Sequence, residues 1–298
     1  MRLVYSPSYR IDLGAHVFPT AKYGLLVERL TSAGLARPGD FVEPIAATWE
    51  QLALVHTPEY LERLRNGDFK VEQLAQLEVN WSPEVVEGFR LMTGGTITAG
   101  RLALARTHGP AVAHLGGGLH HAFPDHGEGF CFFNDIAVAV RVLLSEGLAS
   151  SAAIVDLDVH QGNGTAFIFG GDPHVFTFSM HQQYNYPVQK PQGSLDIGLP
   201  DGTGDDAYNE RLIGALKQVF EHMPDIVFYL AGADPYEDDQ LGGLALSKAG
   251  LRQRDRRVLQ AARNHGVPLV ICLAGGYARR LDDTVDIHYG TIEEAVRL

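Results

Sequence analysis

The sequence of 298 residues has few cysteines, a deficit of positive charge and no long apolar run. Its two cysteines, Cys131 and Cys272, lie in apolar surroundings without C-x-x-C spacing, so neither a disulfide framework nor a zinc–thiolate cluster is expected. A formal net charge of −12 argues against a nucleic-acid-binding surface, which would be basic. It mildly favours cationic substrates or partners, although acidity alone also keeps proteins soluble.

The N-terminal segment and the apolar runs of the chain are those expected of a soluble protein that does not enter a membrane. The N-terminal segment lacks the apolar core of a signal peptide, and no apolar run approaches the ~18 residues that span a membrane. A cytoplasmic location is therefore expected. Hydrophobic residues make up 45% of the chain, and neither repeats nor linkers divide it, so one domain over residues 1–298 is the simplest prediction. Nothing in the sequence indicates an oligomeric state.

Short, unbroken apolar runs rich in β-branched residues recur through the second two-thirds of the chain. Such runs are typical of strands covered on both faces of a parallel sheet. Segments with apolar residues at helical spacing lie between them. This alternation predicts a doubly wound α/β layer structure. The expected strands are 111–115, 152–155, 175–178, 226–230 and 267–273, and the expected helices between them are 135–146, 208–222 and 251–264.

The first third of the chain is richer in helical patterns. A helix is predicted to begin at Ser82 and to run towards residue 105, past Gly94 and Gly95. Adjacent glycines inside a helix cost stability, so they predict either close packing or a break. The other helices expected here are 20–33 and 57–66.

The run 154–160 is an apolar stretch that ends in Asp156, Asp158 and His160, spaced two residues apart. In an extended strand these side chains would project from one face. Two carboxylates and an imidazole together suit a divalent metal ion, and zinc accepts this mixed ligation. The alternative interpretation is a polar strand end that faces water.

Glycines or reactive side chains also follow three other predicted strands at once. Ligand sites in open α/β sheets form beyond the carboxyl ends of the strands, so we expect these segments to meet at one edge. The glycines would let the backbone turn tightly and leave room for a ligand. The segments are 116–121, 231–234 and 274–277.

Together these segments predict metal-assisted hydrolysis of a carbonyl compound. Asp158, His160 and Asp234 could hold one metal ion and leave an open position for water or substrate. A histidine pair would offer a proton acceptor and donor, and a tyrosine would offer a hydroxyl to an oxyanion. The pair is His120 and His121, and the tyrosine is Tyr277.

Five long motifs occur in a fixed order along the chain. They are HLGGGLHHAFPDHGEGFCFFND (114–135), IVDLDVHQGNGT (154–165), FSMH (178–181), LAGADPYEDDQLGGLALS (230–247) and LAGGY (273–277). Their order and content resemble the histone deacetylase superfamily, and the bacterial class IV-like deacetylases are the most similar group. The resemblance extends to HVFP (16–19) and to Lys22–Tyr23. It implies an arginase-like, three-layer α/β/α fold with a central, mainly parallel sheet, and one catalytic domain over residues 1–298.

The resemblance also implies roles for individual residues. It implies one catalytic Zn²⁺ per chain, with Asp158, His160 and Asp234 as its ligands. It further implies that His120 and His121 are the catalytic pair and that Tyr277 binds the substrate carbonyl. Asp156 would support His120 and could also bind K⁺. Asn163 would lie behind His121, where some classes have an aspartate. Asparagine can orient an imidazole but supplies no charge, so the imidazolium form of His121 should be less favoured.

The remaining implied roles concern the substrate. The backbone carbonyl of Gly129 would receive the substrate amide, and the walls of an acyl-lysine tunnel would be Phe130, Tyr186 and Leu241. The implied activity is removal of acetyl or other acyl groups from lysine side chains of proteins or peptides. Whether His120 or His121 acts as the base stays open.

The implied fold would also suit four alternative functions. An acetylpolyamine or small acylamine deacetylase would have the same site, and the acidic stretch 237–239 could attract its cationic substrate unless it is a solvated loop. A long-chain lysine deacylase would need a wider pocket. A non-catalytic scaffold would lack some of the reactive residues, and an arginase-like two-metal hydrolase would need more ligands.

Overall fold

A single parallel sheet forms the centre of the molecule. The computed structural model describes residues 1–107, 109 and 111–297. Among them, eight strands pair in the order β2-β1-β3-β8-β7-β4-β5-β6, and every pairing is parallel. The strands are β1 (Arg2–Val4), β2 (Phe41–Val42), β3 (Ala111–His114), β4 (Ala152–Asp156), β5 (Val175–Gln182), β6 (Leu195–Leu199), β7 (Ile226–Leu230) and β8 (Leu269–Cys272).

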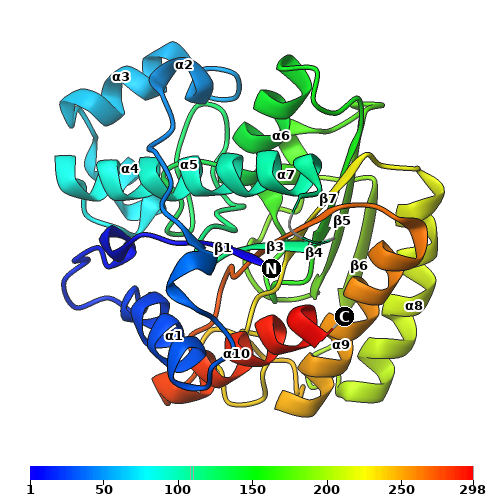
Figure 1. Ribbon diagram of the computed structural model, residues 1–298. Coiled ribbons are helices and arrows are strands. Elements are labelled where there is room, and N and C mark those ends of the chain that lie inside the picture. Colours follow the sequence, from blue (N-terminus) through cyan, green and yellow to red (C-terminus); the bar gives the residue numbers. More distant parts are fainter. Residues whose placement is uncertain (108, 110, 298) are drawn as a thin grey trace.

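Helices cover both faces of this sheet, which confirms the predicted three-layer α/β/α fold. Figure 1 shows α5, α6 and α7 on one side of the strands and α1, α10, α9 and α8 on the other. The helices are α1 (Ala21–Ser32), α2 (Trp49–Leu52), α3 (Pro58–Asn66), α4 (Val71–Leu77), α5 (Pro83–Ala105), α6 (Asp135–Ser145), α7 (Asn163–Ile168), α8 (Asp205–Glu221), α9 (Lys248–His265) and α10 (Leu281–Arg297), with short 3₁₀ turns at Pro7–Tyr9 and Pro38–Asp40.

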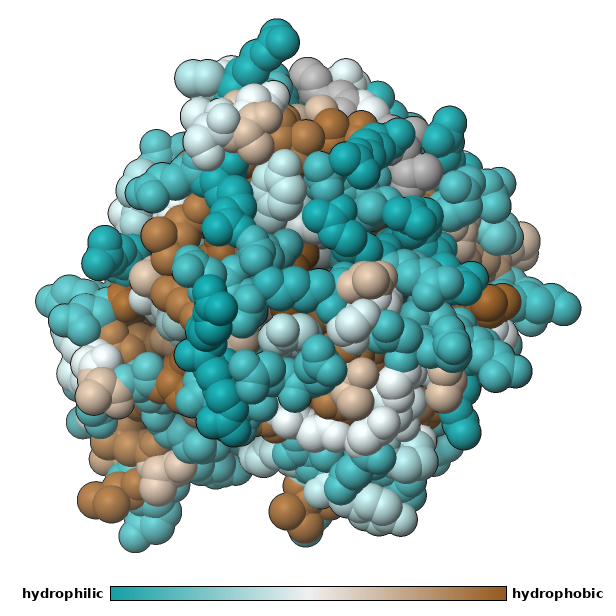
Figure 2. Space-filling view, turned by 90° about the horizontal axis from the view of Figure 1, so that it is seen from below, coloured by the Kyte–Doolittle hydropathy of each residue, from teal (hydrophilic) through white to brown (hydrophobic). Residues whose placement is uncertain are grey.

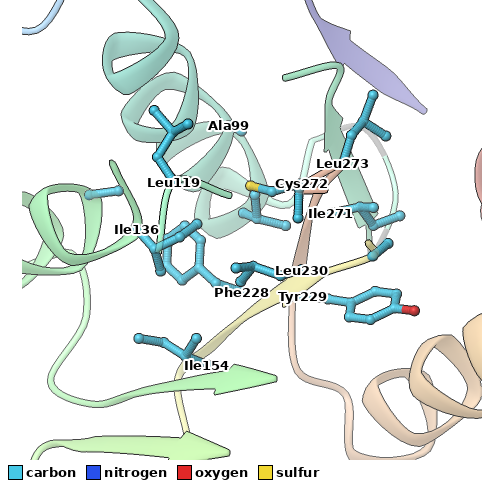
Figure 3. Packing of buried hydrophobic residues seen from close by; sticks show 14 of the residues in the cluster. Ala99, Leu119, Ile136, Ile154, Phe228, Tyr229, Leu230, Ile271, Cys272 and Leu273 are labelled. Carbon is cyan, nitrogen blue, oxygen red and sulfur yellow. The ribbon is translucent and has the colours of Figure 1, made fainter. Parts of the chain in front are cut away.

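The central strands are apolar on both faces because both faces are covered. Every residue of β3, β4, β7 and β8 is buried. Neighbouring residues of β7 point to opposite layers, as strand geometry requires. In Figure 3, Phe228 points towards Ile136, and Tyr229 points the other way, where its hydroxyl bonds to Asp255 of α9.

The adjacent glycines of α5 mark close packing and not a break. The helix continues through Gly94 and Gly95. A Cβ atom on Gly94 would lie 1.8 Å from the carbonyl oxygen of Ile45, and one on Gly95 would lie 2.1 Å from the Tyr9 hydroxyl. The missing side chains therefore let the first segment of the chain pack directly against the helix.

Several elements differ from the sequence prediction because their signals are weak. The strands β1 and β2 are three and two residues long, which is too short to show a pattern. Strand β6 carries Asp196 and Gly198 at the edge of the sheet, and both residue types are depleted in strands. Helices α2, α4, α7 and α10 were not predicted either. The described helices include none that is long and apolar enough to cross a membrane.

The face formed by α1, α10, α9 and α8 has a hydrophilic surface. Figure 2 shows this side mainly in hydrophilic colours, with apolar residues in patches, of which the most extended lies on the left of the view. The apolar faces of these helices are therefore turned towards the sheet, as expected for the outer layer of an α/β fold.

Acid should destabilise the protein through the buried His56. Its Nδ1–H donates to the Phe123 carbonyl at 3.0 Å, and its Nε2 accepts the Asn134 amide at 3.1 Å, so the ring is neutral. Burial lowers its pKa from 6.5 to about 4. The unfolded chain thus binds the proton first, and stability present above pH 6.5 is lost as the pH falls towards 4. A shift of this size corresponds to about 3 kcal/mol.

The variant His56→Gln tests this contribution. We expect it to be less stable than the wild type at pH 7 but to lose less stability between pH 6.5 and 4, as measured by urea unfolding. The matched change at the exposed His174 should leave the pH profile unaltered. An identical slope in His56→Gln and wild type would show that the ring does not carry the effect.

Candidate active site

The reactive segments of the sequence meet because the strands before them are neighbours. Strands β3, β8, β7 and β4 are adjacent in the sheet and run in parallel, so their carboxyl ends share one edge. The loops that follow them carry the histidine pair, Tyr277, Asp234 and the run from Asp158 to His160. This edge is where open α/β sheets form their sites.

A cavity of about 190 Å³ lies at this edge. Nine of the predicted site residues line it: His120, His121, Gly129, Phe130, Asp158, His160, Tyr186, Leu241 and Tyr277. The other three, Asp156, Asn163 and Asp234, are buried behind it. The cavity also has walls that were not predicted from sequence, among them Phe18, Glu78, Cys131 and Asn185.

Asp158, His160 and Asp234 form a group that fits a metal ion. Each offers a ligand atom, and these atoms lie within 4.8 Å of one another. His160 Nδ1 is 3.1 Å from Asp158 Oδ1 and 3.6 Å from Asp234 Oδ2. The atom Asp234 Oδ2 is buried without a hydrogen-bond partner. Such an orphaned carboxylate oxygen beside a nitrogen and a second carboxylate is what a bound cation would satisfy.

The two carboxylates are kept close by backbone donors. Asp158 Oδ2 accepts the Gly275 amide at 2.8 Å, and Asp234 Oδ1 accepts the Val159 amide at 2.9 Å. Burial and the charge of Asp158 raise the pKa of Asp234 to about 7. Two buried carboxylates that face each other are expected to raise one another's pKa in this way.

Asp156, Asp158 and His160 converge, but not on one strand face as the sequence suggested. Strand β4 ends at Asp156, and the chain bends from Asp158 to His160. The bend is stabilised by side chains, because the Asp158 amide donates to Asp156 Oδ1 and the His160 amide donates to Asp158 Oδ1. Aspartate competes with the strand ladder for backbone amides in this way.

His120 is paired with Asp156 behind it. Its Nδ1–H donates to Asp156 Oδ2 at 2.6 Å, and its Nε2 lies 3.8 Å from Asp158 Oδ1. Burial would lower its pKa, but the carboxylates of Asp156 and Asp158 raise it to about 9. The two carboxylates therefore favour the protonated form of His120.

His121 has a different environment and the opposite shift. Its Nδ1 lies 2.7 Å from Asn163 Oδ1, and its ring centroid lies 4.0 Å from that of His120. Burial, followed by the charges of His120 and His160, lowers its pKa well below the usual value. The pKa values of the two adjacent histidines are thus shifted in opposite directions by their surroundings, as is common for acid–base pairs in enzymes.

Aromatic rings form the walls of the cavity. The Phe130 ring is 6.0 Å from that of Tyr277 and stacks at 6.3 Å on Phe18. On the other side, the Tyr186 ring stands edge-on to His121 at 5.0 Å. Phe130 has a φ of 69°, a strained conformation of the kind that clusters at functional sites.

The acidic stretch 237–239 is not simply a solvated loop, because Asp239 is buried. Its Oδ2 accepts the Tyr277 amide at 2.7 Å, and its Oδ1 accepts the Leu241 amide at 2.8 Å. Asp238 pairs with Arg279 at the surface. Asp239 therefore connects the cavity-lining segments that carry Tyr277 and Leu241. Two of the three acidic side chains are thus already paired, which leaves little negative charge in this stretch to attract a cationic substrate.

A buried ammonium group lies beneath the loop that carries Tyr277. Lys22 is 1% exposed, and its Nζ donates to the Ala274 carbonyl at 2.7 Å. Burial lowers its pKa to about 8, although Asp234 and Asp158 oppose the shift. The sequence identified Lys22 only as part of a motif; its position on the buried face of α1 was the available signal.

A second buried cation supports the loops that carry the carboxylates. Arg254 of α9 donates through Nη1 to the carbonyls of Gly232 and Leu157, at 2.6 and 3.3 Å. Its charge is balanced by Asp255, 2.8 Å away. Arg254 thus fixes the backbone one residue before Asp158 and two residues before Asp234.

Another group of possible ligands, His114, Asp135 and Cys272, serves a structural role. Thr96 Oγ1 lies 3.0 Å from His114 Nδ1, and the Tyr9 hydroxyl lies 2.7 Å from His114 Nε2. The Asp135 carboxylate accepts the amides of the segment before His120. Because these polar atoms are already hydrogen-bonded, the group positions a loop and offers a cation no free nitrogen.

Comparison with known proteins identifies the family. The family model of the histone deacetylase domain matches residues 16–290. An uncharacterized protein of Picosynechococcus sp. is 42% identical over 288 residues, which cover 96% of this chain and 95% of that protein. Histone deacetylase 2 of Arabidopsis thaliana is 33% identical over 302 residues, which cover 95% of this chain and 77% of its own. The chain belongs to the histone deacetylase family.

A third relative extends the family to another bacterial protein. The acetoin utilization protein AcuC of Bacillus subtilis is 31% identical over 267 residues, which cover 81% of this chain and 68% of that protein. Family membership confirms the resemblance read from the motifs. It also supports hydrolytic deacetylation as the type of reaction, with acetylated compounds as the substrates.

Proposed function

We propose that this chain is a zinc-dependent amidohydrolase that removes acetyl or other short acyl groups from lysine side chains of peptides and proteins. One observation carries the proposal: the group of Asp158, His160 and Asp234 lies beside a cavity that also reaches His121 and Tyr277. A metal group, a neutral imidazole and a hydroxyl around one cavity are the parts that hydrolysis of an amide requires.

Asp158, His160 and Asp234 would hold one Zn²⁺ per chain. Two oxygens and one nitrogen form a typical ligand set for catalytic zinc, and the orphaned oxygen of Asp234 supports the assignment. When bound, the ion would polarise the substrate carbonyl and make a water molecule more acidic. The K⁺ ion expected near Asp156 stays a prediction of the family resemblance.

His121 is the residue that we propose moves the proton. Its Nδ1–H is directed at Asn163, which leaves Nε2 as an acceptor, and its lowered pKa keeps the ring neutral. The ring could take a proton from the attacking water and then give it to the leaving amine. His120, held by Asp156, would stay cationic and stabilise the developing negative charge.

The remaining residues would bind and orient the substrate. The Tyr277 hydroxyl would donate to the carbonyl oxygen as its negative charge develops. The lysine stem would lie between Phe130 and Tyr186, beside Leu241, all of which line the cavity. The carbonyl of Gly129 would accept the substrate amide.

We also propose that residues 1–298 form one catalytic domain that acts in the cytoplasm. The pairing of β3 with both β1 and β8 supports one domain, because it joins the two ends of the chain in one sheet. The cytoplasmic location rests on the sequence pattern alone.

An acetylpolyamine deacetylase is the second candidate, and Glu78 is the observation that favours it. Glu78 lines the cavity, where a cationic amine could meet it. Burial raises the pKa of Glu78, so a cationic partner would stabilise its charge. The stretch 237–239 no longer supports this candidate, because Asp239 already binds backbone amides.

A substrate panel tests the two candidates. We expect kcat/KM to be at least ~10-fold higher for acetyl-lysine peptides than for acetylated polyamines or long-chain acyl-lysine peptides. For the long-chain peptides the physical reason is that the buried residues Leu119, Ala274 and Gly275 line the cavity and limit its depth. The reverse order, with Glu78→Gln impairing polyamine turnover alone, would establish the second candidate. An absence of turnover for all of these amides would reject the proposal.

A further inference from the structure

We propose that Glu128 is a positioning residue that holds Asn163 in the orientation His121 needs and fixes the Tyr186 wall of the cavity at the same time. This inference rests on the proposed function and deepens it. Glu128 directly precedes the lining residue Gly129, and sequence patterns did not single it out.

One carboxylate oxygen of Glu128 makes both connections. Oε1 accepts the Asn163 amide, Nδ2–H, at 2.7 Å and the Tyr186 hydroxyl at 2.6 Å. The second oxygen, Oε2, accepts the Gln76 amide at 3.0 Å and lies 3.5 Å from His126 Nε2. Glu128 therefore has donors on both oxygens, and its side chain is only 14% exposed.

This arrangement decides which way the Asn163 amide points. The oxygen and nitrogen of an asparagine amide have nearly the same shape, so packing alone does not distinguish the two orientations. An ionised carboxylate accepts hydrogen bonds but cannot donate them. Glu128 therefore requires Asn163 Nδ2 on its own side, and Asn163 Oδ1 is turned to His121, 2.7 Å from its Nδ1.

The orientation of Asn163 in turn selects the tautomer of His121. Because Asn163 Oδ1 can only accept, the proton of the neutral ring must lie on Nδ1. That leaves Nε2 unprotonated, which is the state that a base requires. No carboxylate lies directly behind His121 among the described residues. Glu128 acts in its place, through the side-chain amide of Asn163. Its negative charge is retained because the donors around it lower its pKa to about 2, although burial opposes this shift.

The bond to Tyr186 links the same carboxylate to substrate binding. The Tyr186 ring stands edge-on to both His121 and His160, at 5.0 and 6.1 Å. A wall held in this position would fix the lysine stem relative to the base. Loss of Glu128 should therefore affect both turnover and substrate affinity.

The tautomer of His121 is the direct test, and it needs no substrate. In ¹⁵N–¹H NMR spectra of the zinc-loaded protein, with the signal assigned through His121→Ala, we expect a ring protonated on Nδ1 only. The variant Glu128→Ala should give a mixture of both tautomers. Glu128→Gln, which has almost the same shape and can still accept through its amide oxygen, should show a smaller change. The exposed Glu72→Gln of α4 is the matched control and should resemble the wild type.

Kinetics should separate the two connections. We expect Glu128→Ala to lower kcat ~10-fold and to raise KM, as is common for residues that orient catalytic groups. Tyr186→Phe, which breaks only the hydroxyl bond, should raise KM while kcat stays within about twofold of the wild type, since Asn163 keeps its partner. Asn163→Ala should lower kcat by an amount that a further Glu128→Ala change does not increase.

Two results would overturn the inference. One is a single Nδ1-protonated tautomer of His121 in Glu128→Ala, and the other is unchanged kcat in both Glu128 variants. If Glu128→Ala does not fold, Glu128→Gln decides the question by the same two measurements. A wild-type protein that hydrolyses none of the substrates would reject the proposed function, but the tautomer measurement would still test the role of Glu128.

Discussion

Replacement of Tyr277 by phenylalanine is expected to lower kcat by ~10²–10³, the usual cost of removing one donor to an oxyanion. The phenyl ring would keep its contacts with Phe130 and Phe18, at 6.0 and 6.3 Å, so the cavity wall should persist. Only the hydroxyl would be lost. The measurement is kcat and KM with an acetyl-lysine peptide, together with the zinc content of the purified variant.

The matched control is Tyr184→Phe, because Tyr184 is 80% exposed and does not line the cavity. It should retain wild-type kcat. Zinc content should be the same in both variants, since neither hydroxyl belongs to the proposed ligand group. Wild-type turnover by Tyr277→Phe would remove the carbonyl-binding role of this residue, whereas loss of zinc would mean that the variant disturbs the metal group instead.

The sequence predicted most accurately the strands that consist of unbroken apolar runs. Strands β3, β4, β7 and β8 are fully buried, so nothing interrupts their apolar runs, and their order along the chain placed the reactive loops correctly at one edge. The short strands β1 and β2 gave no such pattern. Strand β1 forms on the edge of β3, and β2 forms on the edge of β1, which is a tertiary effect.

At the site, the reactive residues and the two side chains directly behind the histidines, Asp156 and Asn163, could be named from sequence, whereas the other supporting residues could not. Glu128, Asp239 and Lys22 act through partners far away in the chain, such as Asn163, Tyr277 and Ala274. Their sequence surroundings show only a charge in a loop or on a helix. Hydrogen bonds between distant segments leave no local pattern, so such supports become visible only in three dimensions.

Asp158→Ala is expected to abolish retention of zinc. The change removes one of three proposed ligands and leaves the buried Asp234 and His160 without their shared neighbour. Elemental analysis should find about one zinc ion per wild-type chain, as a three-ligand catalytic site requires. We expect the affinity of the variant to fall by more than the ~100-fold that loss of a supporting partner can cost. Undiminished zinc content would refute the ligand assignment.

A glycine beside the ligands gives a finer test of the same group. A Cβ atom on Gly275 would lie 2.0 Å from Asp234 Oδ2 and 2.6 Å from Asp158 Oδ2, so Gly275→Ala must displace both carboxylates while every proposed ligand stays in the chain. We expect zinc affinity to fall ~10–100-fold. The control is Gly214→Ala in α8, where nothing lies within 4 Å, and this change should leave zinc affinity unaltered and raise stability slightly. Equal zinc affinity in the two variants would place the metal away from these oxygens, because steric displacement acts only on the atoms that the new methyl group meets.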